Sequence, residues 1–190
     1  MVTKLRAEFL NINTPPHIFT LIVLSGLGAL SLSIFLSSIL EMSVFFNKSY
    51  ALMQLSISLY LITTAFFQII AGPLSDKFGR RIITLFSIMI FIIASLGCFF
   101  STKFEFFIFF RLLQASIAAG FLMSRVIIRD ITSENEAASM IGYVTMGMSI
   151  IPLFAPGLGG LIQMLLGWPS IFLIMSVSYT HLTLPTKRIV

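Results

Sequence analysis

Two apolar runs, 51–70 and 82–100, stand on either side of a short polar stretch, Gly72–Arg81, and this pairing constrains the fold most. An α-helix needs about 20 apolar residues to cross a hydrocarbon layer of roughly 30 Å. Hydrophobic residues make up 57% of the chain and charged residues only 10%, and the mean hydropathy is +1.03. A soluble domain of 190 residues cannot bury so much apolar surface. The sequence therefore predicts an all-α integral membrane protein in which these two helices are antiparallel neighbours.

The same length criterion predicts five complete membrane-spanning helices and the start of a sixth. The predicted spans are 17–40, 51–70, 82–100, 106–128 and 137–163, followed by a partial helix at 170–176. A cleaved signal peptide is the competing interpretation of the first run, but its apolar core is too long and no small-x-small cleavage site follows it. We expect His17 at the membrane interface and not as a ligand. External connections are expected at Glu41–Tyr50, at Ser101–Glu105 and around Trp168, a residue typical of the interface.

The stretch Gly72–Arg81 is expected to be a cytoplasmic loop. Gly72-Pro73 should end the incoming helix, because proline lacks an amide hydrogen and disfavours a helical residue before it. Gly79 should permit a tight turn. The loops assigned to the cytoplasm hold Lys4, Arg6, Lys77, Arg80, Arg81 and Arg129, whereas the external loops hold only Lys48 and Lys103. Basic loops stay inside, so we expect a multi-pass protein of the cell inner (plasma) membrane with a cytoplasmic N-terminus.

The last residues differ in character from the rest of the chain. Apolar character stops near Met175, and residues 177–190 read VSYTHLTLPTKRIV. This string resembles a translated sequencing-library adaptor. We therefore expect residues 1–176 to be the transmembrane bundle, residues 177–190 to be an assembly artefact, and the natural gene to continue. A natural polar tail is the alternative, and it would require a half-length sixth helix that cannot span the bilayer.

Polar side chains inside the predicted spans are the candidates for a functional site. Ser56, Tyr60, Thr64 and Gln68 recur at spacings of four, which places them on one face of a helix. Polar side chains in a membrane face the bundle interior or a wet cavity. Cavity lining and hydrogen bonding between helices both explain this stripe, and the two interpretations stay open.

The predicted fourth helix contains two arginines. Arg125, near the inner end, can extend its guanidinium to the interface. Arg111 lies about two turns from the outer end, where a guanidinium is costly unless water or an acceptor meets it, so it is a functional candidate. Gln114 shares its face. The predicted fifth helix should begin with a capping box at Ser133.

The predicted fifth helix is rich in glycine and proline. One of its faces carries Ser149, Pro152, Pro156, Gly160 and Gln163 at spacings of three and four. Small residues on such a face allow another helix to approach closely, and the prolines should bend the axis.

Several of these stretches resemble known signatures. The polar loop resembles the major facilitator superfamily signature G-x-L-a-D-r-x-G-r-[rk]; the matching residues are Gly72, Leu74, Asp76, Gly79, Arg80 and Arg81, with Lys77 as a conservative variant. Arg111-Leu-Leu-Gln114 resembles the R-x-x-Q element of drug:proton antiporters. Their fifth-helix G-P-x-x-G-G element resembles Ala155–Gly160, where Ala155 replaces a glycine. Arg125-Val-Ile-Ile-Arg129-Asp130 and Gly167-Trp168 are similar to the Bcr/CflA subfamily of multidrug efflux carriers.

The resemblance implies the N-terminal six-helix half of a major facilitator fold, which works by alternating access with a missing C-terminal half. It implies a cytoplasmic latch loop (Gly72, Leu74, Asp76, Lys77, Gly79, Arg80, Arg81), a substrate and coupling cavity (Ser33, Tyr60, Thr64, Arg111, Gln114) and antiporter-type helix packing (Pro152, Pro156, Gly159, Gly160). Met and Phe walls would suit amphipathic small molecules. The proton gradient would be the energy source, without a cofactor or a metal.

One departure concerns proton coupling. The subfamily often places an aspartate in its first helix, where this chain has Ser33, and no Asp or Glu lies inside the complete predicted helices. Coupling needs a group that changes charge near neutral pH, and arginine stays protonated. The coupling acid is therefore Glu41, or lies in the missing half, or is absent.

Three functions remain open at the level of the sequence. Multidrug efflux is favoured. An importer of a sugar or an organic anion is disfavoured by the Pro-Gly element of the fifth helix. An enzyme or a non-transporting membrane protein is disfavoured because the only histidines are His17 and His181, and no nucleophile–base pattern is present. The net charge of +5 does not indicate nucleic-acid binding, since the cations are spread over loops and helix ends.

Overall fold

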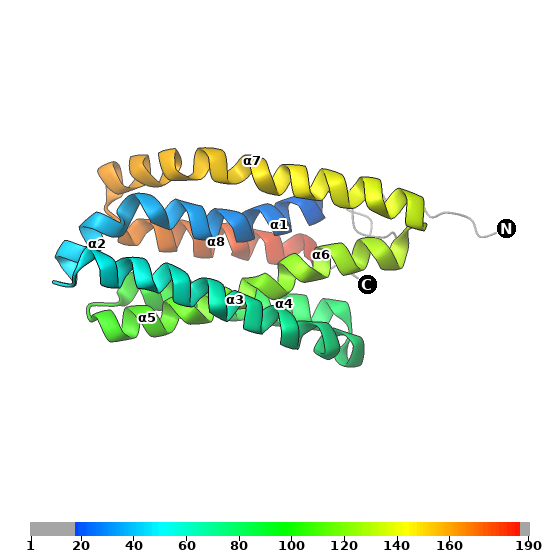
Figure 1. Ribbon diagram of the computed structural model, residues 1–190, viewed down its shortest axis with the longest axis horizontal. Helices are drawn as coiled ribbons and strands as arrows, with labels where there is room; N and C mark the ends of the chain where they lie inside the picture. The colour runs from blue at the N-terminus through cyan, green and yellow to red at the C-terminus, as the bar shows by residue number, and fades with distance from the viewer. Residues whose placement is uncertain (1–17, 187–190) are drawn as a thin grey trace.

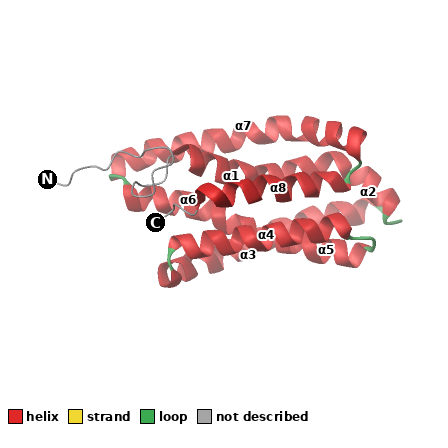
Figure 2. Ribbon diagram, turned by 180° about the vertical axis from the view of Figure 1, so that it is seen from behind, coloured by secondary structure: helices red, strands yellow, loops and turns green. Residues whose placement is uncertain are grey.

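The computed structural model describes the backbone of residues 18–186 and the side chains of that range except those of 134–135 and 181–186. Within this range the chain forms eight α-helices and two short 3₁₀ segments joined by turns (Figures 1 and 2). The predictions for His17, Lys4, Arg6 and residues 1–16 lie outside the described residues.

Five helical segments are long and apolar enough to cross a membrane, which confirms the predicted fold class. The first consists of α1 (Ile18–Ser33), η1 (Ile34–Ser38) and α2 (Ile39–Phe45); the second is α3 (Tyr50–Phe78) and the third α4 (Arg80–Phe100); the fourth consists of α5 (Phe104–Leu113), η2 (Gln114–Ser116) and α6 (Ile117–Ile131); the fifth lies in α7 (Glu134–Leu166). Helix α8 runs over Pro169–Thr186 and is longer than the partial helix predicted at 170–176.

The helices run along the long axis of the molecule and alternate in direction (Figure 1). The α3–α4 and α6–α7 connections lie at one end of the bundle, where α8 also ends. The α2–α3, α4–α5 and α7–α8 connections lie at the opposite end. The described connections that were assigned to the cytoplasm therefore share one end of the molecule.

The predicted helix end at Gly72-Pro73 is wrong. Helix α3 continues through Pro73 to Phe78, so most of the stretch predicted as a loop is helical. Proline has a backbone φ that fits a helix and removes a single hydrogen bond, which costs little at a polar helix end where water can replace it. The predicted tight turn at Gly79 is confirmed: its φ of 92° is in the region that favours glycine.

Other predicted connections are also shorter in the structure. Glu41 lies within α2 and not in a loop, and α3 begins at Tyr50 behind the N-cap Ser49. Only residues 132–133 separate α6 from α7, and Ser133 occupies the N-cap position without a capping hydrogen bond from its side chain. Hydropathy marks only the part of a helix that lies in hydrocarbon, whereas backbone hydrogen bonding continues into the polar flanks.

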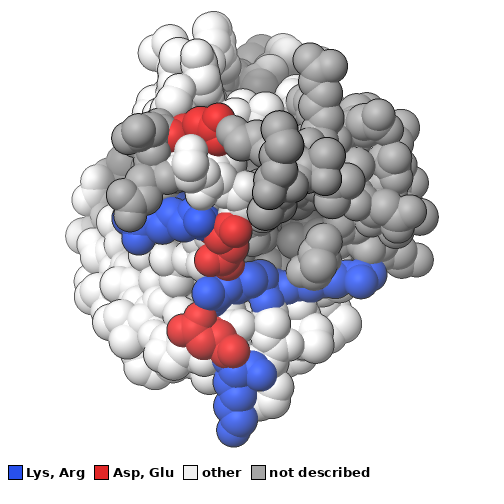
Figure 3. Space-filling model, turned by 90° about the vertical axis from the view of Figure 1, so that its right-hand side faces the viewer, with Lys and Arg blue, Asp and Glu red and all other residues white. Residues whose placement is uncertain are grey.

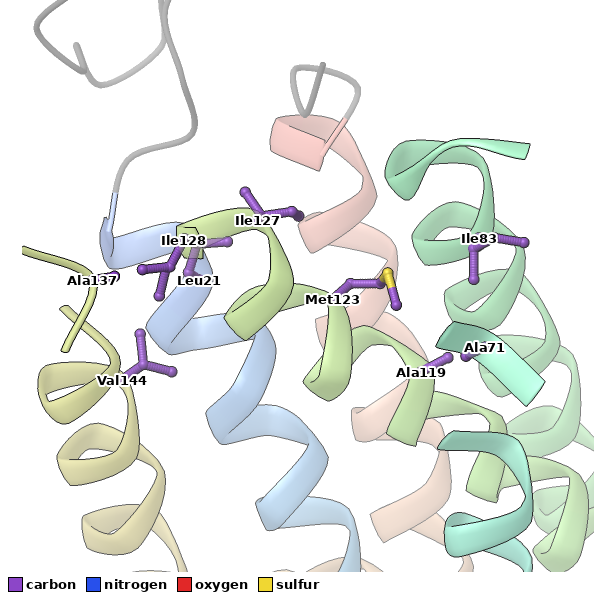
Figure 4. Packing of buried hydrophobic residues seen from close by; sticks show 9 residues of the cluster. All are labelled: Leu21, Ala71, Ile83, Ala119, Met123, Ile127, Ile128, Ala137 and Val144. Carbon is purple, nitrogen blue, oxygen red and sulfur yellow. The ribbon is translucent and has the colours of Figure 1, made fainter. Parts of the chain in front are cut away.

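The core consists of layers that follow each other along the bundle. Near the end that carries the α3–α4 turn, residues from five helices meet (Figure 4): Leu21, Ala71, Ile83, Ala119, Met123, Ile127, Ile128, Ala137 and Val144. At the opposite end the layer is aromatic and includes Phe35, Phe46, Phe107, Trp168 and Phe172. Trp168 is only 6% exposed and packs on Phe45 at a centroid distance of 5.2 Å, so its ring belongs to this layer, and its position at the membrane interface stays a prediction.

Helix α7 packs closely against the first span, and of the residues expected to pack, Gly159 and Gln163 lie in this contact whereas Gly160 does not. A Cβ on Gly159 would lie 2.5 Å from the carbonyl oxygen of Ile34, whereas a Cβ on Gly160 would meet nothing within 4 Å. Ala155 is fully buried on the same side as Gly159. Gln163 joins this contact, because its Oε1 accepts a hydrogen bond of 2.7 Å from Ser38 Oγ. The two helices approach at Gly159, and Gly160 does not take part.

These two adjacent glycines provide a matched test of the helix contact. Gly159→Ala is expected to lower the free energy of unfolding by about 1–3 kcal/mol, because backbone cannot move aside for the added methyl group. Gly160→Ala should be neutral or stabilise by up to about 1 kcal/mol, since alanine favours helix. Thermal unfolding followed by circular dichroism in detergent measures both variants. Equal losses in both would contradict the packing described here.

Candidate functional site

Arg111 is the largest fully buried side chain of the described chain, although it carries a charge. It is located near the end of α5, directly before η2. Its Nη1 donates a hydrogen bond of 2.7 Å to Gln114 Oε1, and its Nη2 donates one of 3.2 Å to the carbonyl oxygen of Ser31. Gln114 in turn donates to Ser95 Oγ at 2.7 Å. The guanidinium is thus held by neutral acceptors from its own span and from the first.

Two aromatic rings enclose the same guanidinium. Its Cζ lies 4.3 Å from the ring centroid of Phe35 and 4.4 Å from that of Tyr60. A cation between two desolvated aromatic faces is attracted to both. Among the described side chains no carboxylate forms an ion pair with Arg111, and its Nε has no hydrogen-bond partner. The charge is therefore solvated by dipoles and rings and is not neutralised.

Arg111 also connects the two irregular segments of the bundle. Phe35 belongs to η1 and Gln114 begins η2, and these are the only 3₁₀ segments of the described residues. A stretch of 3₁₀ helix inside a longer helix often marks a hinge. The contacts of one side chain hold both segments together in the membrane-spanning part of the fold.

A half-open cavity of about 280 Å³ lies next to this cluster. Its lining comes from the first, second, fourth and fifth spans: Gly28, Ala29, Leu32, Ser33, Tyr60, Leu61, Thr64, Gln68, Ile117, Ala118, Phe121, Met148 and Pro152. Most of these side chains are apolar, and none of them carries a charge. The cavity can accept a mainly apolar molecule with a few hydrogen-bonding groups.

The structure divides the predicted cavity residues into two groups. Ser33, Tyr60 and Thr64 line the cavity. Arg111 and Gln114 do not, because both are fully buried behind the lining. Tyr60 connects the groups, since it belongs to the lining and its ring contacts the Arg111 guanidinium.

Sequence reasoning missed the partners of Arg111. Ser31, Ser95 and Phe35 were not singled out, although each contacts the Arg111–Gln114 pair. Many small polar residues of this chain are buried, so an isolated serine in an apolar run carries no specific signal. Ser31, Phe35 and Ser95 come from other spans than Arg111, and hydropathy does not reveal which residues of different spans meet.

The guanidinium of Arg125 packs against a neighbour on its own helix, and its extension to the membrane interface stays a prediction. Its Cζ lies 4.6 Å from the ring centroid of Phe121, which lines the cavity. Its Nε is buried and has no hydrogen-bond partner among the described residues.

At the end of the bundle that bears the α3–α4 turn, charged side chains of both signs form a band (Figure 3). Arg80 is central to it: Nη1 lies 2.5 Å from Asp76 Oδ1, and Nε donates a hydrogen bond of 3.2 Å to Asp130 Oδ2. Arg80 also bonds the hydroxyl of Ser75. It thereby joins the end of α3 to the end of α6.

The remaining residues of the predicted latch lie around the triad formed by Asp76, Arg80 and Asp130. Leu74, Lys77, Gly79 and Arg81 are exposed, and Gly72 is half-buried. Lys77 Nζ lies 5.4 Å from the ring centroid of Phe78. Asp76 thus pairs with an arginine of the same motif, and the link across helices goes through Arg80 to Asp130.

Comparison with known protein families gives a match that covers most of the chain. Residues 18–184 match the Major Facilitator Superfamily. The chain belongs to this superfamily. Superfamily membership, together with five apolar helices long enough to span a membrane, indicates a multi-pass membrane protein.

Several curated superfamily proteins resemble the chain. It is 33% identical over 162 residues to the uncharacterized MFS-type transporter YdgK of Bacillus subtilis, covering 84% of this chain and 40% of that protein. It is 32% identical over 148 residues to a chloramphenicol resistance protein of Pseudomonas aeruginosa, covering 77% and 35%. It is 27% identical over 169 residues to multidrug resistance protein D of Escherichia coli, covering 88% and 43%. The chain thus spans less than half the length of these relatives.

Proposed function

We propose that this chain is the N-terminal portion of a multidrug efflux carrier of the Bcr/CflA subfamily, which exports amphipathic small molecules by proton-coupled alternating access. The observation that carries the proposal is the half-open, mainly apolar cavity between four spans, with the buried Arg111 cluster directly behind it. Relatives named for chloramphenicol and multidrug resistance support the direction of transport. A sugar would need more hydrogen-bonding side chains than the four polar ones in this lining.

In this proposal the triad Asp76–Arg80–Asp130 is the latch of one conformational state. When the cytoplasmic end is closed, both ion pairs of the triad would be present. Opening of this end would require the ends of α3 and α6 to separate, which breaks the pair between Arg80 and Asp130. The membrane orientation that fits this role places the triad and the N-terminus in the cytoplasm, in agreement with the distribution of basic residues.

Proton coupling in this proposal depends on the rest of the protein. No carboxylate lines the cavity, Ser33 occupies the position of the subfamily aspartate, and Glu41 is exposed on α2. The coupling acid would therefore lie in the C-terminal half, and the natural gene would continue past residue 176. Arg111 would bias the proton affinity of that acid without carrying a proton itself.

Expression of the intact gene in a bacterium without its own drug pumps tests this proposal. We expect higher resistance to chloramphenicol and lower accumulation of the drug in energised cells, with both effects abolished by a protonophore. Uptake of the drug, or resistance that survives collapse of the proton gradient, would contradict proton-coupled export. An open reading frame that ends near residue 190 without a second bundle would contradict the proposed fragment.

A further inference from the structure

Two aromatic rings in the wall of the cavity each have a guanidinium group packed on them. The ring of Tyr60 lies 4.4 Å from Arg111 Cζ, and the ring of Phe121 lies 4.6 Å from Arg125 Cζ. Both rings belong to the lining, whereas neither arginine does. Arg111 is fully buried and stands one ring behind the cavity surface, and Arg125 adds a second positive charge that contacts the wall at Phe121.

No described carboxylate neutralises either cation. Arg111 donates to the side-chain amide of Gln114 and to a backbone carbonyl, both of which are neutral. Arg125 forms no ion pair among the described residues, and its Nε is buried without a partner. Helices α3 and α6, which carry Tyr60 and Arg125, each contain one aspartate, Asp76 and Asp130. Both of these carboxylates bind Arg80 at the end of the bundle.

The lining itself adds no compensating charge. Its polar members are Ser33, Tyr60, Thr64 and Gln68. Thr64 uses its hydroxyl to donate a hydrogen bond of 2.6 Å to the carbonyl oxygen of Leu61 in its own helix. A positively charged ligand would thus find neither a carboxylate nor a full set of acceptors in this wall.

The size of the resulting discrimination follows from Coulomb's law. A ligand charge packed on one of these rings lies about 9 Å from the guanidinium behind it, if one van der Waals layer is added to the ring distance. At an effective dielectric constant of about 20, one such pair changes the affinity for a unit charge by about 20-fold. The ring also presents a weaker negative face to the ligand, because the cation on its other side attracts the same π electrons.

We infer that this cavity selects neutral and anionic amphiphiles and rejects lipophilic cations. The inference rests on the proposed efflux function and makes it specific, since it names the substrate class. Groups whose oxygen atoms carry a partial or full negative charge, such as carbonyl, nitro or carboxylate groups, would pack against Tyr60 and Phe121. Quaternary ammonium and phosphonium compounds would be excluded by charge and not by size.

The test uses two ions of nearly the same shape and opposite charge, tetraphenylborate and tetraphenylphosphonium, with chloramphenicol as a neutral probe. Binding to the purified chain in lipid nanodiscs is measured by equilibrium dialysis, and binding to empty nanodiscs is subtracted. We expect tetraphenylborate to bind at least about tenfold more tightly than tetraphenylphosphonium.

Two variants then move the preference in a predictable way. Ser33→Asp places a carboxylate in the lining and should lower the anion-to-cation affinity ratio by about tenfold or more, whereas Ser33→Asn measures the effect of size alone. Arg125→Gln removes one cation near the helix end and should lower the same ratio without adding a charge to the cavity. If the Ser33→Asp chain does not fold because its aspartate lies within the membrane, Arg125→Gln still tests the inference.

The outcomes separate the inference from the proposed function. Equal or tighter binding of tetraphenylphosphonium by a chain that still binds chloramphenicol would overturn the inference and leave efflux in place. An affinity ratio that neither variant changes would overturn it as well. Failure of the folded chain to bind any of the three probes would remove the proposed drug cavity and the inference together.

Discussion

Replacing Arg111 by methionine is expected to leave the chain at least as stable as the wild type, whereas Arg111→Lys should lose about 2–4 kcal/mol of unfolding free energy. The structure gives this buried cation no carboxylate, so its desolvation is a net cost. Methionine has a similar length, and its sulfur packs well on the rings of Phe35 and Tyr60. The loss of the hydrogen bond to Gln114 costs about 1–3 kcal/mol, which the relief of desolvation offsets.

Lysine should destabilise the fold more than methionine does, because it keeps the buried charge but loses the contacts that stabilise this charge. An ammonium is more strongly hydrated than a guanidinium, and it cannot stack flat between two rings or reach Gln114 and the Ser31 carbonyl together. Thermal unfolding of the three proteins in the same detergent ranks them. A lysine variant as stable as the wild type, with an unfolded methionine variant, would show that the charge stabilises the fold and must have an anionic partner.

The same pair of variants bears on function. If Arg111→Met is stable but the full-length transporter carrying it no longer confers drug resistance, then the arginine is present for transport and not for folding. A costly charge buried in a membrane span marks a candidate functional site.

The second large effect is expected at the other end of the bundle. Asp76→Asn in the full-length protein should reduce drug efflux to the level of cells without the transporter, while membrane insertion stays normal. Asp76 is 66% exposed on its side chain and pairs with Arg80. Exposed ion pairs of this kind contribute only about 0–1 kcal/mol to stability, so the variant should fold. Its effect on transport comes from the latch, because a neutral amide cannot hold Arg80 as strongly.

Glu105→Gln provides the matched control for this experiment. Glu105 is also an exposed carboxylate, but it lies in the first turn of α5, at the opposite end of the bundle. We expect it to transport as the wild type does. Undiminished resistance in the Asp76→Asn strain, or an equal loss in both strains, would exclude a specific latch at the α3–α4 turn.

Residue patterns located the charged motif around Asp76 and the arginine within the fourth span but not all of their partners. The motif placed Asp76 and Arg80 in one loop, and the structure pairs these two residues and adds Asp130 of α6 as the third member. Arg111 was expected to face the cavity together with Tyr60, yet it lies fully behind that ring. Pairings between helices depend on how the helices are rotated against each other, and no local pattern records that rotation.

The fifth span shows the same limit. Its small residues indicated close packing, and they do pack, but through Gly159 and Ala155 and not through Gly160. Two adjacent positions differ by about 100° around a helix, so a small error in the assumed face exchanges one for the other. Pro73 is a similar case, because its position at a polar helix end makes it tolerable where a proline in the middle of the span would not be.

The sequence alone determined the class of fold, the number of complete spans and their alternating direction, because bilayer thickness and helix rise are constraints that each apolar run must satisfy by itself. Only the tertiary structure decided which faces meet. Each residue in η2 turns the chain by about 120° where an α-helix turns it by about 100°, so three such residues rotate α6 by about 60° against α5. Arg111 and Tyr60 belong to different spans, so the contact between them arises from packing of the helices, whereas Arg125 and Phe121 meet because they are four residues apart on one helix.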